Sequence, residues 1–275
     1  MRPYSRVYAT VNLDAVASNM RSMRDNLPAS TLIMGSVKAD GYGHGSVPVA
    51  KTIEPYVFGY AVATIDEGII LRRHGINKTI LILGVTHESR YEDLLRYDIR
   101  TAMFQYEKAK KLSDLALKQG KKAVVHLALD TGMSRIGMKA DREHAKEAAA
   151  IAALEGIEVE GLFTHFARAD ETDKSAYEEQ YRRYKEFLGY LKELGVKIPI
   201  RHCSNSAGIV ESLESNHMDM VRAGIAIYGM YPSDEVDHNS VKLTPAMEIK
   251  SCITYIKEIE AGTAAGRYIV AIDGR

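Results

Sequence analysis

A lysine followed by a run of glycines is the first feature of this chain that could do chemistry. Lys38 comes directly after the apolar run 32–37 and opens the segment Lys38–Gly45, KADGYGHG. Burial disfavours the ammonium form of a lysine, and a neutral amine is a nucleophile toward aldehydes. The three glycines let the backbone pass close to a ligand. The segment therefore predicts a Schiff-base lysine, with a solvated lysine before a flexible turn as the alternative.

Two arginines and a histidine accompany later apolar runs. Arg135 follows the run 123–129 and could offer its forked donors to an oxygen anion beside an imine, with a surface ion pair as the alternative. His165 closes the run 161–166, where a satisfied core histidine is the competing interpretation. Arg222 stands in a strand-like run, where an unpaired charge would be costly. We therefore expect Arg222 to meet a ligand nitrogen or a neighbour such as His165.

Small residues near the end of the apolar pattern indicate a phosphate site. Ser206 follows the run 198–203, and its hydroxyl could cap the next helix and, with nearby N–H groups, hold a phosphate. Gly224 and Ile225 lie in the last apolar run, 221–228. In barrels of eight parallel strands, phosphates bind at the loops after the seventh and eighth strands. Both segments occupy those places in the pattern.

The elements that must position these residues alternate between strand-like and helix-like segments, which predicts a parallel sheet. A short strand over 5–11 and a helix capped by Asn12 come first. The eight apolar runs that suit strands buried on both faces are 32–37, 56–63, 79–85, 100–104, 123–129, 161–166, 198–203 and 221–228. Helix-like segments lie near 46–53, 64–74, 88–96, 106–119, 141–154, 173–194 and 206–214. This count predicts an α/β protein with a closed (β/α)8 TIM barrel. An open doubly wound sheet is the alternative, although no G-x-G-x-x-G follows the first strand.

The pattern changes after Tyr231. Residues 232–240 are polar and are typical of a linker or surface loop. Residues 246–260 and 267–272 are strand-like. We therefore expect two parts: a TIM barrel over 1–240, and over 241–275 the truncated start of a β-rich domain too short to fold alone.

Composition narrows the classes of function. The chain has 36 basic and 36 acidic residues, so nothing favours nucleic acid or an anionic membrane as a partner. Two cysteines, no apolar signal core and no long apolar segment predict a cytoplasmic protein. The nine histidines show no H-x-x-x-H and the cysteines no C-x-x-C, so we expect no metal site. Neither a nucleophile elbow nor a phosphate loop of the P-loop type is present.

Together these blocks resemble the alanine racemase family. The segment 37–45, VKADGYGHG, is similar to the family's cofactor-lysine signature, commonly V-K-A-N-A-Y-G-H-G, and the likeness extends from residue 4 to about 260. The family fold is a (β/α)8 barrel followed by a mostly β domain. The resemblance implies an isomerase that uses pyridoxal 5'-phosphate and interconverts L- and D-alanine for cell-wall synthesis.

The resemblance also implies how the cofactor is held. Lys38 would bind pyridoxal phosphate and act as one of two racemising bases. Tyr42 would donate its hydroxyl to the phosphate. Ser206, with the backbone amides of Gly224 and Ile225, would complete the phosphate site.

Around the cofactor ring, the resemblance places Arg135 at the phenolic oxygen and Arg222 at the pyridine nitrogen, with His165 behind Arg222. Lys38, His165 and Arg222 are thus the expected catalytic residues. An arginine keeps its proton, so the ring nitrogen would stay largely unprotonated, which discourages transamination.

Two departures from the family pattern bear on activity. Ala128 stands where many members have a carbamylated lysine that orients the phenol-side arginine. The second base in the family is a tyrosine from the partner subunit's C-terminal domain, whereas the stretch 262–268 here carries only Tyr268, which is out of register.

These departures leave alternatives open. They predict impaired turnover and a monomer or weakened dimer in place of the family's homodimer. The alternatives are a barrel that binds pyridoxal phosphate without racemising anything, or an enzyme of this kind acting on another small amino acid.

Overall fold

The computed structural model describes residues 6–260 and residue 263. Contacts divide the chain into a large unit, Val11–Met247, and a small unit formed by the residues on either side of it. Within the described part, no helix is long and apolar enough to cross a membrane.

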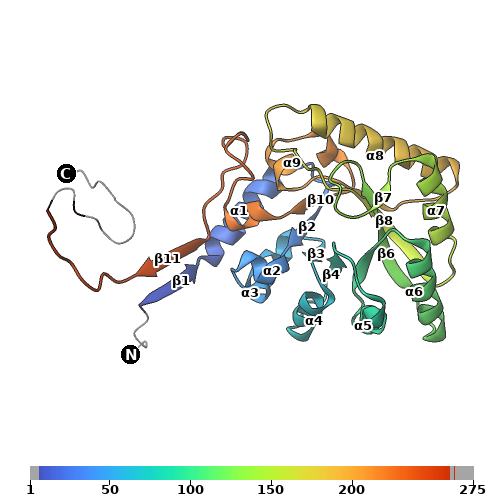
Figure 1. Cartoon of the computed structure of the whole chain (residues 1–275), viewed down its shortest axis with the longest axis horizontal. Helices are drawn as coiled ribbons and strands as arrows, with labels where there is room; N and C mark the ends of the chain where they lie inside the picture. Colours follow the sequence, from blue (N-terminus) through green and yellow to red (C-terminus); the bar gives the residue numbers. More distant parts are fainter. Residues whose placement is uncertain (1–5, 261–262, 264–275) are drawn as a thin grey trace. The chain divides into compact units, whose positions relative to one another are not determined.

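Eight parallel strands form the central sheet of the large unit (Figure 1). They are β2 (Leu32–Ser36), β3 (Gly59–Val62), β4 (Thr79–Ile82), β5 (Arg100–Met103), β6 (Ala123–Asp130), β8 (Ile157–Phe163), β9 (Ile200–His202) and β10 (Met220–Ala223). Their spatial order is β10-β2-β3-β4-β5-β6-β8-β9, so the last strand pairs with the first. At the seam between β9 and β10, the Arg222 N–H donates to the Ser204 carbonyl at 3.0 Å. The sheet is thus a nearly closed barrel. The (β/α)8 prediction is confirmed, and the open sheet is wrong.

Helices surround the strands on the outside. The α-helices of the large unit are α1 (Leu13–Asp25), α2 (Lys38–Tyr42), α3 (Ser46–Ile53), α4 (Ile65–Arg73), α5 (Tyr91–Tyr97), α6 (Tyr106–Lys118), α7 (Arg142–Ala152), α8 (Ser175–Glu193) and α9 (Ser206–Val210). Short 3-10 helices are η1 (Glu54–Tyr56), η2 (Glu88–Arg90), η3 (Glu214–His217) and η4 (Ile225–Tyr228). Asn12 caps α1 through its side chain, as predicted, by accepting from the Asp14 and Ala15 amides.

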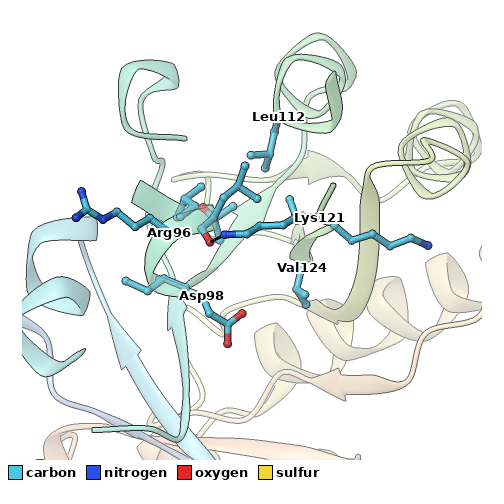
Figure 2. A pocket seen from close by; sticks show the side chains of 11 residues that line it. Arg96, Asp98, Leu112, Lys121 and Val124 are labelled. Atoms are coloured by element: carbon cyan, nitrogen blue, oxygen red, sulfur yellow. Dashed lines mark hydrogen bonds between the residues drawn. The ribbon is translucent and has the colours of Figure 1, made fainter. Parts of the chain in front are cut away.

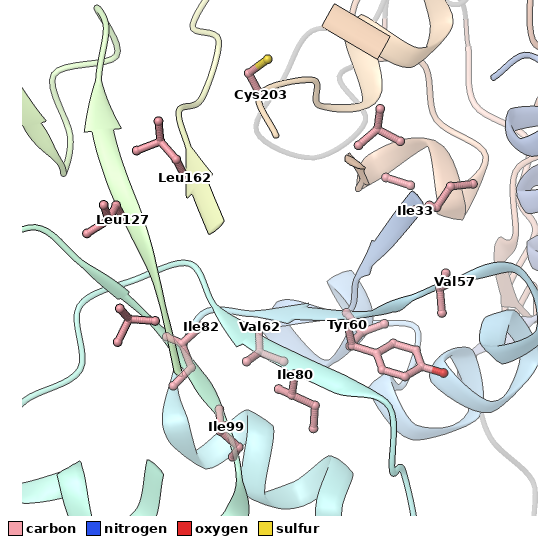
Figure 3. Close-up of a cluster of buried hydrophobic side chains, with 14 of the residues drawn as sticks. Ile33, Val57, Tyr60, Val62, Ile80, Ile82, Ile99, Leu127, Leu162 and Cys203 are labelled. Atoms are coloured by element: carbon pink, nitrogen blue, oxygen red, sulfur yellow. The ribbon is translucent and has the colours of Figure 1, made fainter. Parts of the chain in front are cut away.

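The main core lies between the sheet and these helices. Tyr60, Val62, Ile80 and Ile82 point from β3 and β4 into it (Figure 3). Tyr60 is fully buried, and its hydroxyl donates to the Ala50 carbonyl at 2.7 Å. Alternate residues of the same strands face the barrel interior, where a second apolar cluster forms from Met34, Ala61, Leu81 and Met220. Burial on both faces explains why the strands lack polar alternation.

Several predicted boundaries were wrong. The run 221–228 is one strand in the prediction, but β10 ends at Ala223 and Ile225–Tyr228 forms η4. Gly224, at φ −125° and ψ −109°, leaves the extended conformation, and an apolar run alone does not distinguish strand from helix. The predicted helix 206–214 ends at Val210, because Ser212 adopts a left-handed conformation at φ 51°. The two-residue strand β7 (Met138–Lys139), which pairs with β6, was not predicted.

The small unit contains a two-stranded sheet of β1 (Val7–Val11) and β11 (Met247–Ser251). The Cys252 amide donates to the Arg6 carbonyl at 3.2 Å beside it. Residues 252–260 carry no regular structure, so the strand-like interpretation of 246–260 holds only for β11. The predicted strand 267–272 and Tyr268 lie outside the described residues.

Candidate active site

A cavity of about 220 Å³ opens at the carboxyl ends of the strands. Its walls come from the residues that end or follow β2, β3, β4, β6 and β8, together with β10. The lining residues are Lys38, Ala63, Leu83, Gly84, Leu129, Met133, Arg135, Ile136, Phe163, His165 and Arg222. Four of the predicted site residues, Lys38, Arg135, His165 and Arg222, therefore meet around one cavity.

A second cavity, of about 360 Å³, lies at the opposite, amino ends of the strands (Figure 2). It is lined mainly by residues that precede or begin β5 and β6, among them Asp98 and Lys121. The Lys121 amine already donates to the Leu95 carbonyl at 2.9 Å. In barrels of this kind, chemistry takes place at the carboxyl ends, whereas the amino ends serve stability. We therefore place the candidate site in the smaller cavity.

Lys38 is held by an unusual turn of backbone. Ala39, Asp40 and Tyr42 have φ values of 50°, 50° and 53°, and Gly41 has 63°, so α2 contains one left-handed turn. Left-handed backbone is unfavourable for residues with a β-carbon. The glycines at 41, 43 and 45 indicate from the sequence that the backbone can take positive φ values there. The residue types at 39 and 40 do not indicate the left-handed conformation.

Two carboxylates hold this turn in place. Glu67, in the first turn of α4, accepts from the Ala39 amide at 2.8 Å and from the Ala63 amide at 2.7 Å. The Asp40 carboxylate accepts from the Ser46 amide at 2.8 Å. Glu67 thus connects the residue after Lys38 to the end of β3. The sequence interpretation missed it, because Ala39, the partner beside Lys38, is 28 residues away in sequence.

Lys38 is half-buried, and its amine lies 5.7 Å from the centre of the Tyr42 ring. The Tyr42 ring in turn packs on Tyr228, with centroids 5.0 Å apart. Tyr228 is buried, and its hydroxyl donates to the Ser36 carbonyl at 2.9 Å. This contact fixes the tyrosine pair to the end of β2, two residues before Lys38.

Three of the residues predicted for a phosphate converge beside this pair. Ser206 Oγ accepts from the Gly224 amide at 2.9 Å and from the Ala226 amide at 3.4 Å. A β-carbon on Gly224 would stand 3.5 Å from both Ser206 Oγ and the Tyr42 hydroxyl. Two hydroxyls and a glycine backbone therefore face one point, as an oxyanion site requires. The predicted capping role of Ser206 was wrong: Asn205 caps α9 by accepting from the Gly208 amide, because its carboxamide oxygen reaches that amide.

Arg222 is buried at 4% exposure, and protein groups accept from both of its terminal nitrogens. One terminal nitrogen donates to His202 Nδ1 at 2.8 Å and to the His202 carbonyl at 3.0 Å. The other donates to the carbonyls of Thr164 at 2.6 Å and Cys203 at 3.0 Å, with His165 Nδ1 at 3.5 Å. Burial lowers the pKa of Arg222 to about 10, so the guanidinium remains charged at neutral pH. The expected neighbour His165 is present, but His202, which we did not predict, is closer.

His165 is neutral under ordinary conditions. Burial, followed by the positive charges of Arg222, Arg135 and Lys38, lowers its pKa to about 3. A neutral imidazole between cations can direct hydrogen bonds but adds no charge of its own. The shift also shows that these four side chains share one electrostatic environment.

Arg135 is exposed and stands on a loop between β6 and β7. The Asp130 carboxylate shapes this loop by accepting from the Gly132 and Ser134 amides, each at 3.0 Å. Ala128 is buried against Ala102 and Phe163 inside the barrel. Ala128 therefore presents only a methyl group in an apolar cluster, which offers Arg135 no hydrogen-bond partner.

No group of three or more His, Cys, Asp or Glu side chains within residues 6–260 could hold a metal ion. The mouth of the barrel instead offers a lysine amine, two arginines, a neutral histidine and a hydroxyl-lined oxyanion site. A (β/α)8 barrel with these groups at the carboxyl ends of its strands defines the class of barrel enzymes that work through a lysine.

Comparison with known proteins identifies the family. Residues 11–232 match the model of the alanine racemase N-terminal domain. The alanine racemase of Desulforamulus reducens is 43% identical over 94% of this chain and 70% of its own length, and that of Clostridium kluyveri is 42% identical over 96% and 67%. The chain belongs to the alanine racemase family, a family of isomerases, and spans roughly seven-tenths of the first of these relatives.

Solved structures agree with this assignment. The alanine racemase of Clostridium difficile 630 in complex with cycloserine superposes with a TM-score of 0.90 at 42% identity, covering 94% of this chain and 71% of that one. The alanine racemase of Bacillus anthracis with bound L-Ala-P gives 0.87 at 32% identity, covering 98% and 70%. The resemblance inferred from the sequence is confirmed.

Proposed function

We propose that this barrel binds pyridoxal 5'-phosphate through Lys38 and interconverts L- and D-alanine. The observation that carries the proposal is the convergence of Lys38, the tyrosine and serine hydroxyls, and Arg222 at one end of the barrel. Members of the family use this cofactor, and the residues present here fit it. The Gly224 backbone leaves open the point that the Tyr42 and Ser206 hydroxyls both face.

Each residue would hold one part of the cofactor. The Lys38 amine would carry it covalently, and the Tyr42 and Ser206 hydroxyls with the Ile225 amide would bind its phosphate. The Gly224 amide, which donates to Ser206 Oγ in this structure, would turn to the phosphate as well. When bound, pyridoxal phosphate supplies an electron sink that makes the α-proton of an amino acid removable.

Arg222 would donate to the ring nitrogen, and it holds its proton too tightly to give it up. Arg135 would bind the phenolic oxygen. His165, neutral and 3.5 Å from Arg222, would orient that guanidinium.

Racemisation needs a proton carrier on each face of the α-carbon, and Lys38 serves one face. By family analogy the second is a tyrosine from the partner's C-terminal domain, and alanine racemases act as homodimers. Sedimentation at micromolar concentration tests whether this chain forms the family dimer, a weakened dimer or a monomer.

Borohydride trapping tests the site directly. The protein is incubated with pyridoxal phosphate, reduced and digested, and the modified peptide is identified by mass spectrometry. We expect the adduct on Lys38, with no adduct in Lys38→Ala. Lys121→Ala, which removes one of the two lysine amines that line the opposite cavity, should keep the adduct. An unchanged yellow adduct in Lys38→Ala would refute the assignment.

One observation favours a second function, cofactor binding without racemisation: the cavity lining offers Lys38 as its single amine base beside a neutral imidazole. Proton exchange of L-alanine in deuterated water separates the cases. Racemisation requires a second base, exchange with retained configuration means that Lys38 works alone, and no exchange means binding only. The same assay with serine tests for another small amino acid as the substrate.

We also propose that residues 1–240 form the catalytic barrel, that 241–275 begin a β-rich domain, and that the protein works in the cytoplasm on small molecules rather than on nucleic acid or membranes. Limited proteolysis, with mass measurement of the surviving fragment, tests the boundary. Cleavage within 100–200 ahead of any cleavage near 240 would argue against it.

A further inference from the structure

A continuous chain of buried polar groups crosses the barrel interior behind Arg222. Glu160 Oε2 lies 2.9 Å from His126 Nε2, His126 Nδ1 lies 2.8 Å from His202 Nε2, and His202 Nδ1 lies 2.8 Å from the Arg222 guanidinium. His126 and His202 are fully buried. The side chain of Glu160 retains 19% exposure and lies 3.5 Å from Arg100.

The chain has one consistent direction. A guanidinium only donates, so His202 Nδ1 must accept from Arg222 and the His202 proton must sit on Nε2. That N–H donates to His126 Nδ1, which leaves the His126 proton on Nε2, where it donates to the Glu160 carboxylate. An imidazolium at either histidine would set two N–H groups against each other. Burial, with the charge of Arg222, lowers the pKa of His202 well below its ordinary value, which agrees with a neutral ring.

Local sequence builds this geometry into β8. Val125 pairs with Val159, but His126 pairs with Gly161, so Glu160 is the extra residue of a bulge. A bulge re-aims a side chain, and here it brings the carboxylate to His126. Gly161 leaves room for the imidazole, because a β-carbon at 161 would stand 2.4 Å from His126 Nδ1.

The other half of the barrel shows that a polar interior is not needed for packing. Met34, Ala61, Leu81 and Met220 fill that side with apolar side chains. A buried polar network is costly unless every member is paired. The chain from Glu160 is fully paired, and it ends on the guanidinium that faces the cavity.

We propose that Glu160 is a positioning residue for Arg222 and acts through His126 and His202. Glu160 at one end of the chain and Arg222 at the other fix the tautomers of the two histidines. Glu160 is the terminal acceptor that allows both histidines to be neutral and to point the same way. His202 then presents a lone pair to Arg222 and holds the guanidinium plane. The effect of Glu160 on cofactor binding rests on the proposed contact of Arg222 with the cofactor ring. The tautomers of His126 and His202 do not depend on that contact.

The first test uses the full chain without cofactor. ¹⁵N-histidine NMR at neutral pH, assigned with His126→Gln and His202→Gln, should show the Nε2–H tautomer at both positions. An Nδ1–H tautomer or an imidazolium at either position would overturn the proposal. Because no pyridoxal phosphate is present, this result is independent of whether Lys38 binds it.

The second test separates positioning from mere structure. Glu160→Gln keeps an acceptor for His126, whereas Glu160→Leu removes it. We expect Glu160→Leu to mix the His126 tautomers and to weaken pyridoxal phosphate binding about tenfold, as loss of a buried charge-assisted hydrogen bond would. Glu160→Gln should keep both tautomers and bind within about threefold of wild type by the same reasoning.

Leu81→Ala is the matched control, since it removes apolar volume from the other side of the interior. It should lower the melting temperature without changing the tautomers or the cofactor affinity. If Leu81→Ala weakens binding as much as Glu160→Leu at equal loss of melting temperature, Glu160 has only a structural role and the proposal fails.

Discussion

Removing the Glu67 carboxylate should release the left-handed turn that follows Lys38. Ala39, Asp40 and Tyr42 each take a conformation that costs roughly 1–2 kcal/mol, so the turn stores about 3–6 kcal/mol. Glu67 opposes its relaxation with two charge-assisted hydrogen bonds, to the exposed Ala39 amide and the part-buried Ala63 amide. Water can replace the first bond more easily than the second.

We therefore expect Glu67→Ala to cost about 2–3 kcal/mol, of which about 1.5–2 comes from the part-buried Ala63 bond and about 0.5–1 from the exposed Ala39 bond that water can replace. At ~3 °C per kcal/mol for a domain of this size, the melting temperature should fall by roughly 6–9 °C. The Lys38 amine should also lose its fixed position, so pyridoxal phosphate should bind more weakly.

Calorimetry of the protein without cofactor measures the first effect, and absorbance titration with pyridoxal phosphate measures the second. Glu92→Ala is the control, because Glu92 occupies the first turn of α5 as Glu67 occupies that of α4, but Glu92 is exposed whereas Glu67 is half-buried. A melting temperature within 1 °C of wild type, or unchanged cofactor affinity, would show that Glu67 does not hold the turn.

Three further outcomes are expected. His126, His165 and His202 have pKa values lowered by burial, so they are neutral in the folded protein but bind protons in the unfolded chain below about pH 6.5. Stability should therefore be full above that pH and decrease as the pH falls below it, by up to about 4 kcal/mol at pH 5.5 in urea unfolding. For His165 the loss continues toward pH 3, where its folded form also binds a proton. A pH-independent urea midpoint between 7 and 5.5 would contradict this. Gly161→Ala should cost about 1–3 kcal/mol by overpacking against the His126 ring, seen as a lower urea midpoint, and a wild-type midpoint would argue against the close approach. Ser206→Ala should weaken pyridoxal phosphate about tenfold while leaving pyridoxal unaffected, and equal weakening of both would remove Ser206 from the phosphate site.

Local pattern was sufficient for much of the fold. Apolar runs predicted all eight barrel strands, and the predicted cap Asn12 does accept from the first turn of α1. Strand ends were less predictable, as at Gly224, because apolar content is the same in a buried strand and in a buried 3-10 helix.

For the site, the residues directly after strands were the easiest to predict. Lys38 and His165 follow β2 and β8, and the barrel geometry brings such positions together whatever the intervening sequence. The supporting residues were missed for the opposite reason. His126 and Glu160 act through partners far away in the chain, and Glu67 reaches the lysine turn through Ala39, 28 residues earlier. The residue types around them in sequence do not indicate these partners.

Arg222 has a consequence for how this barrel could change. Its backbone and its guanidinium both bridge β9 to β10, at the one place where neighbouring strands of the barrel are not paired along their length. The same residue would therefore both set the protonation of the cofactor's ring nitrogen and join the last two strands of the barrel. A descendant that exchanged this arginine for a carboxylate, to favour a protonated ring, would first need another way to join those strands, which makes such a shift in chemistry a multi-step path.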